Sequence, residues 1–284
     1  MNQKGKLYIV ATPIGNMEDI TIRGIRVLRE VNTVAAEDTR VTARLLSFHQ
    51  IGTPLISLHE HNEIQRVELL IARMDAGESL ALVSDAGTPS VSDPGFRLVR
   101  AAVEKEIQVV PIPGASAAIT GLCASGLPTD SFLFLGFPPK KKGKRTDLLE
   151  SLKKQNTTLI FYESPMRICA FLSELIDILG DRYAVLGREM TKMYEEFIRG
   201  NLSDILENLK NRDAVKGECT LLISGAGEDQ SFCPEDLAEE IEKGLNAGIS
   251  ISDLSKSLAK FFGISRKEVY AQALEIQGGK NAGK

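Results

Sequence analysis

The sequence predicts an α/β protein with two lobes, each built on its own sheet, and a helical C-terminal tail. Short apolar runs alternate with amphipathic helical patterns through the first 124 residues. A second set of strand-like runs follows a break with Gly and Pro at Ser125–Asp130. A chain of 284 residues is long enough for two modest cores. We therefore expect two α/β domains, 1–124 and 125–228, and a helical extension, 229–284.

The first lobe is expected to contain a parallel sheet. Its predicted strands are Leu7–Ala11, Thr33–Ala36, Pro54–Leu58, Leu80–Ser84 and Gln108–Ile112. Helical patterns separate them, such as the apolar spacing over residues 64–74. Strands that alternate with helices are typical of βαβ units, which place the strands side by side in parallel.

The second lobe has more strands than helices, which favours a mixed sheet over a parallel one. Its predicted strands are Phe132–Phe137, Thr158–Tyr162, Tyr183–Gly187, Glu195–Arg199 and Thr220–Ser224.

The tail is predicted to be helical. Leu254, Leu258, Phe261 and Phe262 make an apolar stripe, Gly263 interrupts it, and Ser265 with Glu268 has the spacing of a capping box. This pattern resembles a small helix-turn-helix, which serves either nucleic-acid contact or packing.

Composition narrows the function classes. The net charge of −4 argues against a protein that coats nucleic acid, although it allows a local basic patch. No apolar run approaches the ~18–20 residues that span a bilayer. The polar start Met1–Lys6 does not resemble a secretory signal, so a cytoplasmic location is expected. His59 and His61 lack the HExxH spacing, and no metal is expected.

Polar loops follow all five predicted strands of the first lobe. They cover residues 12–16, 37–40, 59–63, 85–89 and 113–117. Ligands of parallel sheets bind beyond the carboxyl ends of the strands. The Gly-, Pro- and Ser-rich segment Ser84–Asp93 is therefore expected to hold a small organic cofactor. The chain contains no GxxxxGK[ST], GxGxxG or GxSxG pattern, which disfavours phosphate-loop, Rossmann and α/β-hydrolase sites.

Seven motifs carry a family resemblance. They are LYIVATPIGN (7–16), AEDTR (36–40), HEHNE (59–63), SDAGTPSVSDPG (84–95), PGASA (113–117), FYESPMR (161–167) and REMTK (188–192). In order and spacing, from about residue 7 to 225, the chain resembles the bacterial 16S rRNA cytidine 2′-O-methyltransferases of the tetrapyrrole-methylase superfamily. It departs from the usual pattern at Met166, where these enzymes commonly have His.

The resemblance implies an enzyme with S-adenosylmethionine in a cleft between two α/β domains. It implies transfer of the methyl group to a cytidine ribose in the decoding region of 16S rRNA, within the assembled small subunit, and a homodimer. The implied cofactor contacts are Pro13, Asp85, Ala86, Gly87, Thr88, Ser116, Ala117, Glu163 and Thr220. The alternatives are methylation of a tetrapyrrole precursor and a non-catalytic RNA-binding factor for ribosome assembly.

Two further sets of side chains are candidates under this mechanism. A general base for the ribose hydroxyl would come from Glu37, Asp38, His61, Glu189 or Lys192. Phosphate contacts are expected from Arg40 and from the basic segment Lys140, Lys141, Lys142, Lys144 and Arg145.

Overall fold

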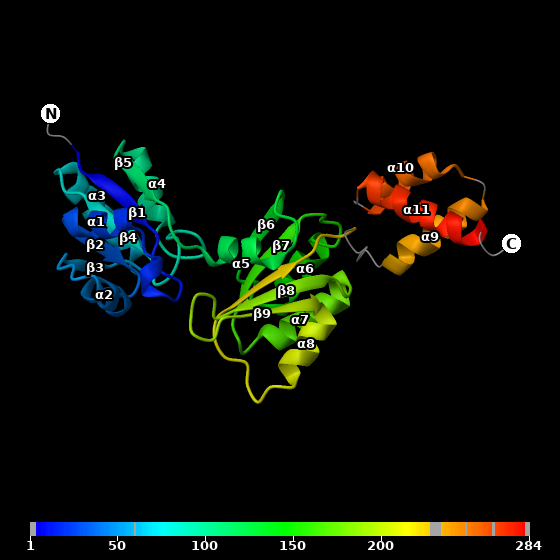
Figure 1. Ribbon diagram of the computed structural model, residues 1–284. Coiled ribbons are helices and arrows are strands. Elements are labelled where there is room, and N and C mark those ends of the chain that lie inside the picture. Colours follow the sequence, from blue (N-terminus) through cyan, green and yellow to red (C-terminus); the bar gives the residue numbers. More distant parts are fainter. Residues whose placement is uncertain (1–3, 60, 228–233, 248, 263–264, 282–284) are drawn as a thin grey trace. The chain divides into compact units, whose positions relative to one another are not determined.

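The computed structural model describes residues 4–59, 61–227, 234–247, 249–262 and 265–281 (Figure 1). The chain divides into two compact units, residues 1–225 and 226–284. The larger unit contains two five-stranded sheets with their helices, and the smaller unit is helical. The prediction of a two-sheet α/β fold with a helical tail is confirmed. The finer division at residues 124 and 228 stays a prediction.

The first sheet is parallel and has the strand order β3-β2-β4-β1-β5. The strands are β1 (Lys6–Val10), β2 (Thr33–Ala36), β3 (Leu55–Ser57), β4 (Leu80–Val83) and β5 (Gln108–Ile112). Each lies within one residue of its predicted bounds. All four residues of β2 and of β4 are buried, because helices cover the sheet on both faces.

Four helices cover this sheet in two layers. Helices α1 (Ile22–Glu30) and α2 (Thr39–Phe48) pack on the face that carries Val34 and Ala36. Helices α3 (Glu63–Asp75) and α4 (Phe96–Glu104) pack on the opposite face, which carries Ala35. Successive strand residues point to opposite faces, so a short apolar run can serve both cores.

The second sheet is mixed and has the order β6-β7-β10-β8-β9. Its strands are β6 (Phe132–Gly136), β7 (Thr158–Glu163), β8 (Tyr183–Arg188), β9 (Glu196–Asn201) and β10 (Cys219–Ile223). Only β6 and β7 pair in parallel, and the other neighbours are antiparallel. This confirms the mixed sheet that the low helix content predicted.

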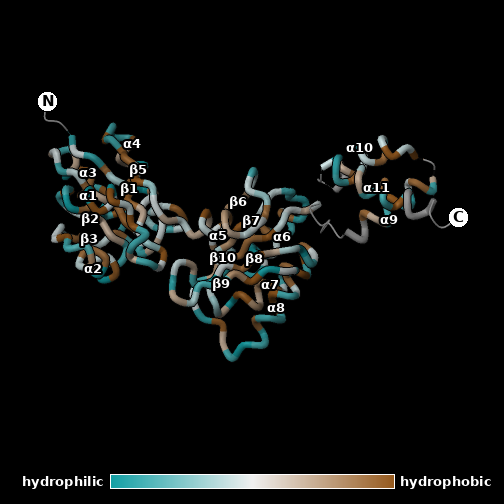
Figure 2. The backbone as a smooth tube through the Cα atoms, viewed as in Figure 1, coloured by the Kyte–Doolittle hydropathy of each residue, from teal (hydrophilic) through white to brown (hydrophobic). Residues whose placement is uncertain are grey.

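The two faces of the second sheet are covered unequally. Three helices, α6 (Lys142–Ser151), α7 (Ile168–Leu179) and α8 (Leu202–Lys210), form the larger core with one face. The opposite face packs against α5 (Ala117–Ser125). Hydrophobic stretches run along the strands and helices, while the long loops are mainly hydrophilic (Figure 2). Helix α5 follows the last strand of the first sheet but belongs to the core of the second, so it joins the two lobes.

The helical unit consists of α9 (Pro234–Asn246), α10 (Ile251–Phe262) and α11 (Arg266–Asn281). Its buried core is Leu237, Ile241, Leu254, Leu258, Val269 and Ala273. The Ser265 hydroxyl accepts a hydrogen bond from the Glu268 backbone N–H at 3.2 Å, as half of the predicted capping box requires. The predicted roles of the Phe261 and Phe262 side chains and of Gly263 lie outside the described residues. Across the described ranges, no helix is both long and apolar enough to cross a membrane.

Candidate active site

The loops after the neighbouring strands β1 and β4 lead to helices on opposite faces of the first sheet. Strand β4 lies between β1 and β2. The helices that follow β1 and β2 cover one face of the sheet, whereas α4, which follows β4, covers the other face. Loops that diverge in this way open a crevice at the carboxyl edge of the sheet. Two backbone hydrogen bonds, of 2.9 and 3.0 Å, tie Thr12 to Gly87 across it. Gly87 has a φ of +80°, which glycine adopts without strain.

A cavity of about 390 Å³ opens beside this junction, and we call it the Asp93 cavity. Its volume falls in the range of roughly 300–1,000 Å³ that is typical of small-molecule sites. The first lobe contributes the end of β2 and the loop after β4, and the second contributes the ends of β7 and the start of β10. The lining residues are Ile14, Glu37, Asp85, Ala86, Gly87, Val91, Ser92, Asp93, Ala117, Phe137, Tyr162, Glu163, Ser164, Glu218, Cys219 and Thr220.

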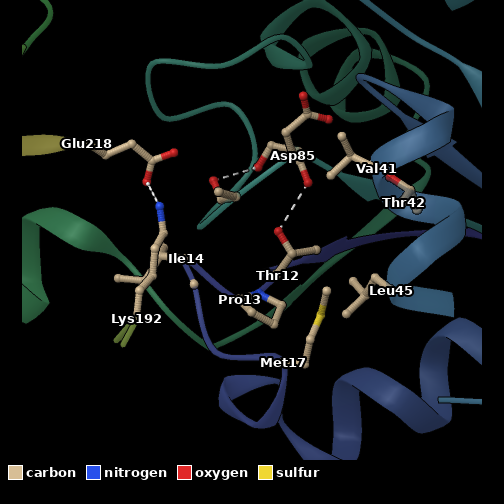
Figure 3. Close-up of a pocket in the computed structure, with 13 residues that line it drawn as sticks. Thr12, Pro13, Ile14, Met17, Val41, Thr42, Leu45, Asp85, Lys192 and Glu218 are labelled. Atoms are coloured by element: carbon tan, nitrogen blue, oxygen red, sulfur yellow. Dashed lines mark hydrogen bonds and ion pairs between the residues drawn. The ribbon is translucent and has the colours of Figure 1, made fainter. Parts of the chain in front are cut away.

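A second hollow of about 210 Å³, the Thr12 cavity, shares Ile14, Asp85, Ala86 and Glu218 with the first. Figure 3 shows Lys192 and Glu218 pointing toward each other on one side and α2 on the other. Their ion pair has an N–O distance of 3.2 Å. The shared residues make the two hollows parts of one crevice.

The structure brings together most of the predicted cofactor contacts. Six of the nine line the Asp93 cavity, namely Asp85, Ala86, Gly87, Ala117, Glu163 and Thr220. Pro13 lines the Thr12 cavity. Thr88 and Ser116 line neither. The Thr88 hydroxyl donates to the Ala115 carbonyl at 3.2 Å, and Ser116 is the N-cap residue of α5.

Three of the carboxylates that line the Asp93 cavity come from the first lobe: Glu37, Asp85 and Asp93. Glu163 and Glu218 of the second lobe also line it, but they pair with Arg167 and Lys192. Burial raises the pKa of Glu37 and of Asp85, with further contributions from neighbouring carboxylates. Burial, followed by the charge of Glu37, raises the pKa of Asp93 to about 6. Each negative charge makes the others harder to ionise, so the cavity is suited to a ligand that carries positive charge.

Four of the five candidates for a general base, those with a carboxylate or imidazole side chain, have different surroundings. Only Glu37 lines the Asp93 cavity. Asp38 caps α2 and pairs with Arg40, whose side-chain and backbone hydrogen bonds lower the Asp38 pKa to about 2. Glu189 accepts a hydrogen bond from Lys192, which lowers its pKa, and His61 is exposed and lines neither cavity. Asp38 and Glu189 are therefore weak bases in this structure.

Glu63 of the HEHNE segment has a structural partner. It is buried, with 7% of its surface exposed, and its Oε1 accepts hydrogen bonds from the backbone N–H groups of Gly95 and Arg97, both at 3.1 Å. Gly95 is the N-cap of α4 and supplies no side chain for this purpose. Glu63 thus anchors the end of the loop that carries Asp85 and Asp93. Among the described parts of the chain, no cluster of His, Cys, Asp or Glu could hold a metal ion.

The basic segment lies at the start of α6. Lys140, Lys141, Lys142 and Lys144 are exposed. Arg145 differs, because its guanidinium forms a two-pronged ion pair with Glu174, with both N–O distances 2.6 Å, and also donates to the carbonyl of Pro139. Arg40 is exposed but pairs with Asp38. The four lysines are thus the more available part of the predicted phosphate contacts.

Sequence reasoning missed the roles of Asp93, Tyr162 and Phe137 in the cavity wall. Asp93 and Tyr162 lie in recognised motifs, Asp93 ends the predicted cofactor segment, and Phe137 ends a predicted strand. In the sequence, these positions indicate only a loop or the end of a strand. The packing of β6 and β7 near the Ser84–Gly95 loop brings the three side chains to one cavity.

The sequence pattern of the family described as tetrapyrrole (corrin/porphyrin) methylases matches residues 6–206. The chain belongs to this family. Relatives named "Ribosomal RNA small subunit methyltransferase I" share 44% identity in Halalkalibacterium halodurans (95% of this chain, 94% of the relative) and 45% in Synechocystis (96% and 99%). The relative of that name in Escherichia coli O157:H7 shares 42% (98% and 97%). The family predicted from the seven motifs is confirmed.

Solved structures support the fold of the tetrapyrrole methylase family. A diphthine synthase aligns with a TM-score of 0.60 at 20% identity, over 78% of this chain and 90% of that one. The cobalt precorrin-4 methyltransferase CbiF aligns with a TM-score of 0.57 at 18% identity, over 77% and 94%. A uroporphyrin-III C-methyltransferase of Thermus thermophilus, solved with S-adenosyl homocysteine, aligns with a TM-score of 0.54 at 19% identity, over 77% and 97%.

Proposed function

We propose that this protein transfers a methyl group from S-adenosylmethionine to a cytidine ribose 2′-hydroxyl in the 16S rRNA of the small ribosomal subunit. The observation that supports this proposal most directly is the carboxylate-lined cavity between the two sheets of a tetrapyrrole-methylase fold. The RNA substrate class is supported by relatives of 42–45% identity that span nearly the whole chain. Cytidine, the 2′-oxygen and the decoding region follow from the motif resemblance alone.

The cavity residues fit this cofactor. S-adenosylmethionine supplies a methyl group activated by a positively charged sulfonium, and its methionine part carries an ammonium group. Glu37, Asp85 and Asp93 provide the opposite charge. Gly87 lets backbone approach a ligand closely, and Ala117, the first residue of α5, lies at the cavity wall, where a helix N-terminus favours an anionic group such as the methionine carboxylate. The residues of the cavity hold and orient the cofactor and the hydroxyl, and alignment of the two supplies much of the rate.

Glu37 is the candidate base that the geometry favours. It is half-buried at the cavity, and a raised pKa makes its carboxylate a better proton acceptor than an ordinary one. Turnover should therefore fall in Glu37→Gln and change little in Asp38→Ala, His61→Ala and Glu189→Ala. Unchanged turnover in Glu37→Gln, with intact cofactor affinity, would exclude Glu37 as the base.

The lysines of the basic segment are proposed to bind rRNA phosphates. Replacing Lys140, Lys141, Lys142 and Lys144 by alanine should weaken binding to the small subunit about tenfold or more near 0.1 M salt. The slope of log affinity against log salt should become shallower by ~0.7 for each phosphate that the variant no longer neutralises, because fewer counterions are released on binding. Filter binding across a salt series measures both quantities.

A control variant separates this local effect from net charge. Replacing four exposed basic residues elsewhere, Arg23, Arg26, Lys105 and Lys210, by alanine makes the same change in charge. We expect that variant to bind with nearly the wild-type slope. Equal losses in the two variants would contradict a dedicated lysine site.

Two alternatives remain as outcomes of the main test. A tetrapyrrole methylase is less favoured, since the tetrapyrrole enzymes among the structural neighbours share only 18–20% identity with this chain. A non-catalytic assembly factor would not need a cavity built for a cationic cofactor. The test is calorimetry with S-adenosylmethionine, followed by transfer of labelled methyl to small subunits from a strain that lacks the gene. Absence of cofactor binding, or of transfer to rRNA, would contradict the proposal.

The assembled small subunit as substrate and a homodimer as the active form are also proposals. The overall negative charge favours a structured particle over naked RNA as the binding target. Transfer to intact subunits that exceeds transfer to extracted rRNA would support the first. Light scattering of the purified protein tests the second.

A further inference from the structure

Phe137 is an aromatic side chain that stands open at the rim of the Asp93 cavity. It follows β6 directly and lines the cavity, yet 55% of its surface is exposed. Its ring contacts that of Tyr162 edge-on, with the ring centroids 5.6 Å apart. One side of the ring is therefore supported by protein, while a large apolar area remains without cover.

The surroundings hold this ring in place. The Tyr162 hydroxyl accepts a hydrogen bond from the Ala118 backbone N–H at 3.1 Å, and the Tyr162 ring also contacts Phe134, at 4.9 Å between centroids. The next residue in the chain, Pro138, is buried, and its ring restricts the backbone beside Phe137. A rigid, half-exposed aromatic ring loses little conformational entropy when a planar ligand stacks on it.

The basic segment begins three residues after Phe137. Pro138 and Pro139 separate the ring from Lys140, so the Cα atoms of Phe137 and Lys140 lie at most ~11 Å apart. That reach corresponds to about three stacked nucleotides at ~3.4 Å each. The same short stretch of chain thus offers an aromatic face at the cavity and positive charge for the adjoining phosphates.

A nucleotide whose ribose enters the cavity must leave its stack in the RNA. Proteins that bind splayed-out RNA bases commonly stack them on aromatic side chains, which replaces the stacking that the base had in the RNA. We infer that Phe137 is the stacking platform for the base of the nucleotide whose ribose is methylated. The inference rests on the proposed function, and it makes Phe137 a residue that positions the substrate.

The test compares four substitutions at one position: Phe137→Ala, Phe137→Leu, Phe137→Tyr and Phe137→Trp. Methyl transfer to unmethylated small subunits should show a kcat/KM about 5- to 150-fold lower in Phe137→Ala, the range expected when one base no longer stacks on an aromatic ring. Phe137→Leu should remain impaired, whereas the tyrosine and tryptophan variants should lie within about threefold of wild type. The affinity for S-adenosylmethionine, measured by calorimetry, should stay the same throughout.

Phe48→Ala is the matched control. Phe48 is 60% exposed and contacts one ring, that of His49, edge-on at 4.9 Å, but it lines neither cavity. Full activity of Phe137→Ala, or rescue by leucine equal to rescue by tyrosine, would overturn the stacking role. Loss of cofactor affinity that matches the loss of kcat/KM would instead place the cofactor's adenine on this ring. Absence of transfer by the wild-type protein would remove the proposed function itself, and this inference with it.

Discussion

Replacing Asp93 by asparagine is expected to weaken the binding of S-adenosylmethionine by about 10- to 150-fold at pH 7.5. The change preserves the size of the side chain but removes the negative charge that faces the Asp93 cavity. A hydrogen bond to a charged group contributes roughly 1.5–3 kcal/mol, which corresponds to this loss of affinity. Calorimetry on the purified protein measures the effect, and Asp130→Asn, which changes an exposed carboxylate, is the control.

The pH dependence of binding gives an independent test. The Asp93 pKa is raised to about 6, so the carboxylate is mostly ionised at pH 7.5 and mostly protonated at pH 5. A cationic cofactor prefers the ionised form. Affinity should therefore fall as the pH is lowered through about 6, and this fall should be smaller in Asp93→Asn. An equal pH dependence in both proteins would contradict the assignment.

Asp93→Asn should weaken cofactor binding but should make the cofactor-free protein more stable. A carboxylate whose pKa is raised by folding destabilises the folded state as the pH rises above the unfolded-state value of 3.8. At pH 7.5 the free energy of unfolding of the asparagine variant should therefore be higher than that of the wild type, by less than ~3 kcal/mol because solvent screens this partly exposed carboxylate. Weaker binding together with greater stability would separate a binding role from misfolding.

Glu63→Ala is expected to lower the free energy of unfolding by about 2–4 kcal/mol. The substitution leaves the buried N–H group of Gly95 and the partly buried N–H group of Arg97 without their acceptor, and each such loss costs ~1–3 kcal/mol. Urea denaturation measures the change. Glu63→Gln keeps an oxygen acceptor, so we expect a smaller loss, of ~1 kcal/mol.

Glu68→Ala is the control for the helix itself, because Glu68 is an exposed residue of the same helix α3. Its effect should lie within ~0.5 kcal/mol, as is usual for surface sites. Since Gly95 ends the loop that carries Asp85 and Asp93, Glu63→Ala should weaken cofactor binding as well. Stability equal to that of Glu68→Ala would show that Glu63 does not anchor α4.

Local pattern alone located the secondary structure of the larger unit well. The ten strands in its described residues lie within two residues of their predicted bounds, because short apolar runs bounded by Gly, Pro and polar loops are a local signal. The parallel and mixed characters of the two sheets followed from the number of helices between strands. The ordered motifs also identified the family, since each motif is a contiguous segment.

The surroundings of individual polar side chains depend on partners that are far apart in the sequence, so local pattern did not predict them. Asp38 lies in the AEDTR motif, and its backbone N–H donates a hydrogen bond of 3.0 Å to Asp85, which lies 47 residues away in sequence. Arg145 stays a predicted phosphate contact, and Glu174, 29 residues away in sequence, engages its guanidinium. Glu63 resembled part of a polar loop, but the N–H groups that it satisfies are more than 30 residues away.

The Ser84–Asp93 segment shows both sides of this division. Its glycine, proline and serines, with its place after a predicted strand, were enough to mark it as a cofactor loop. Whether Asp85 and Asp93 face a common cavity with Glu37 depends on how β2 and β4 pair and on the anchor from α3. Burial and charge set the pKa of a carboxylate and its choice of ligand, and both arise only when distant segments pack together.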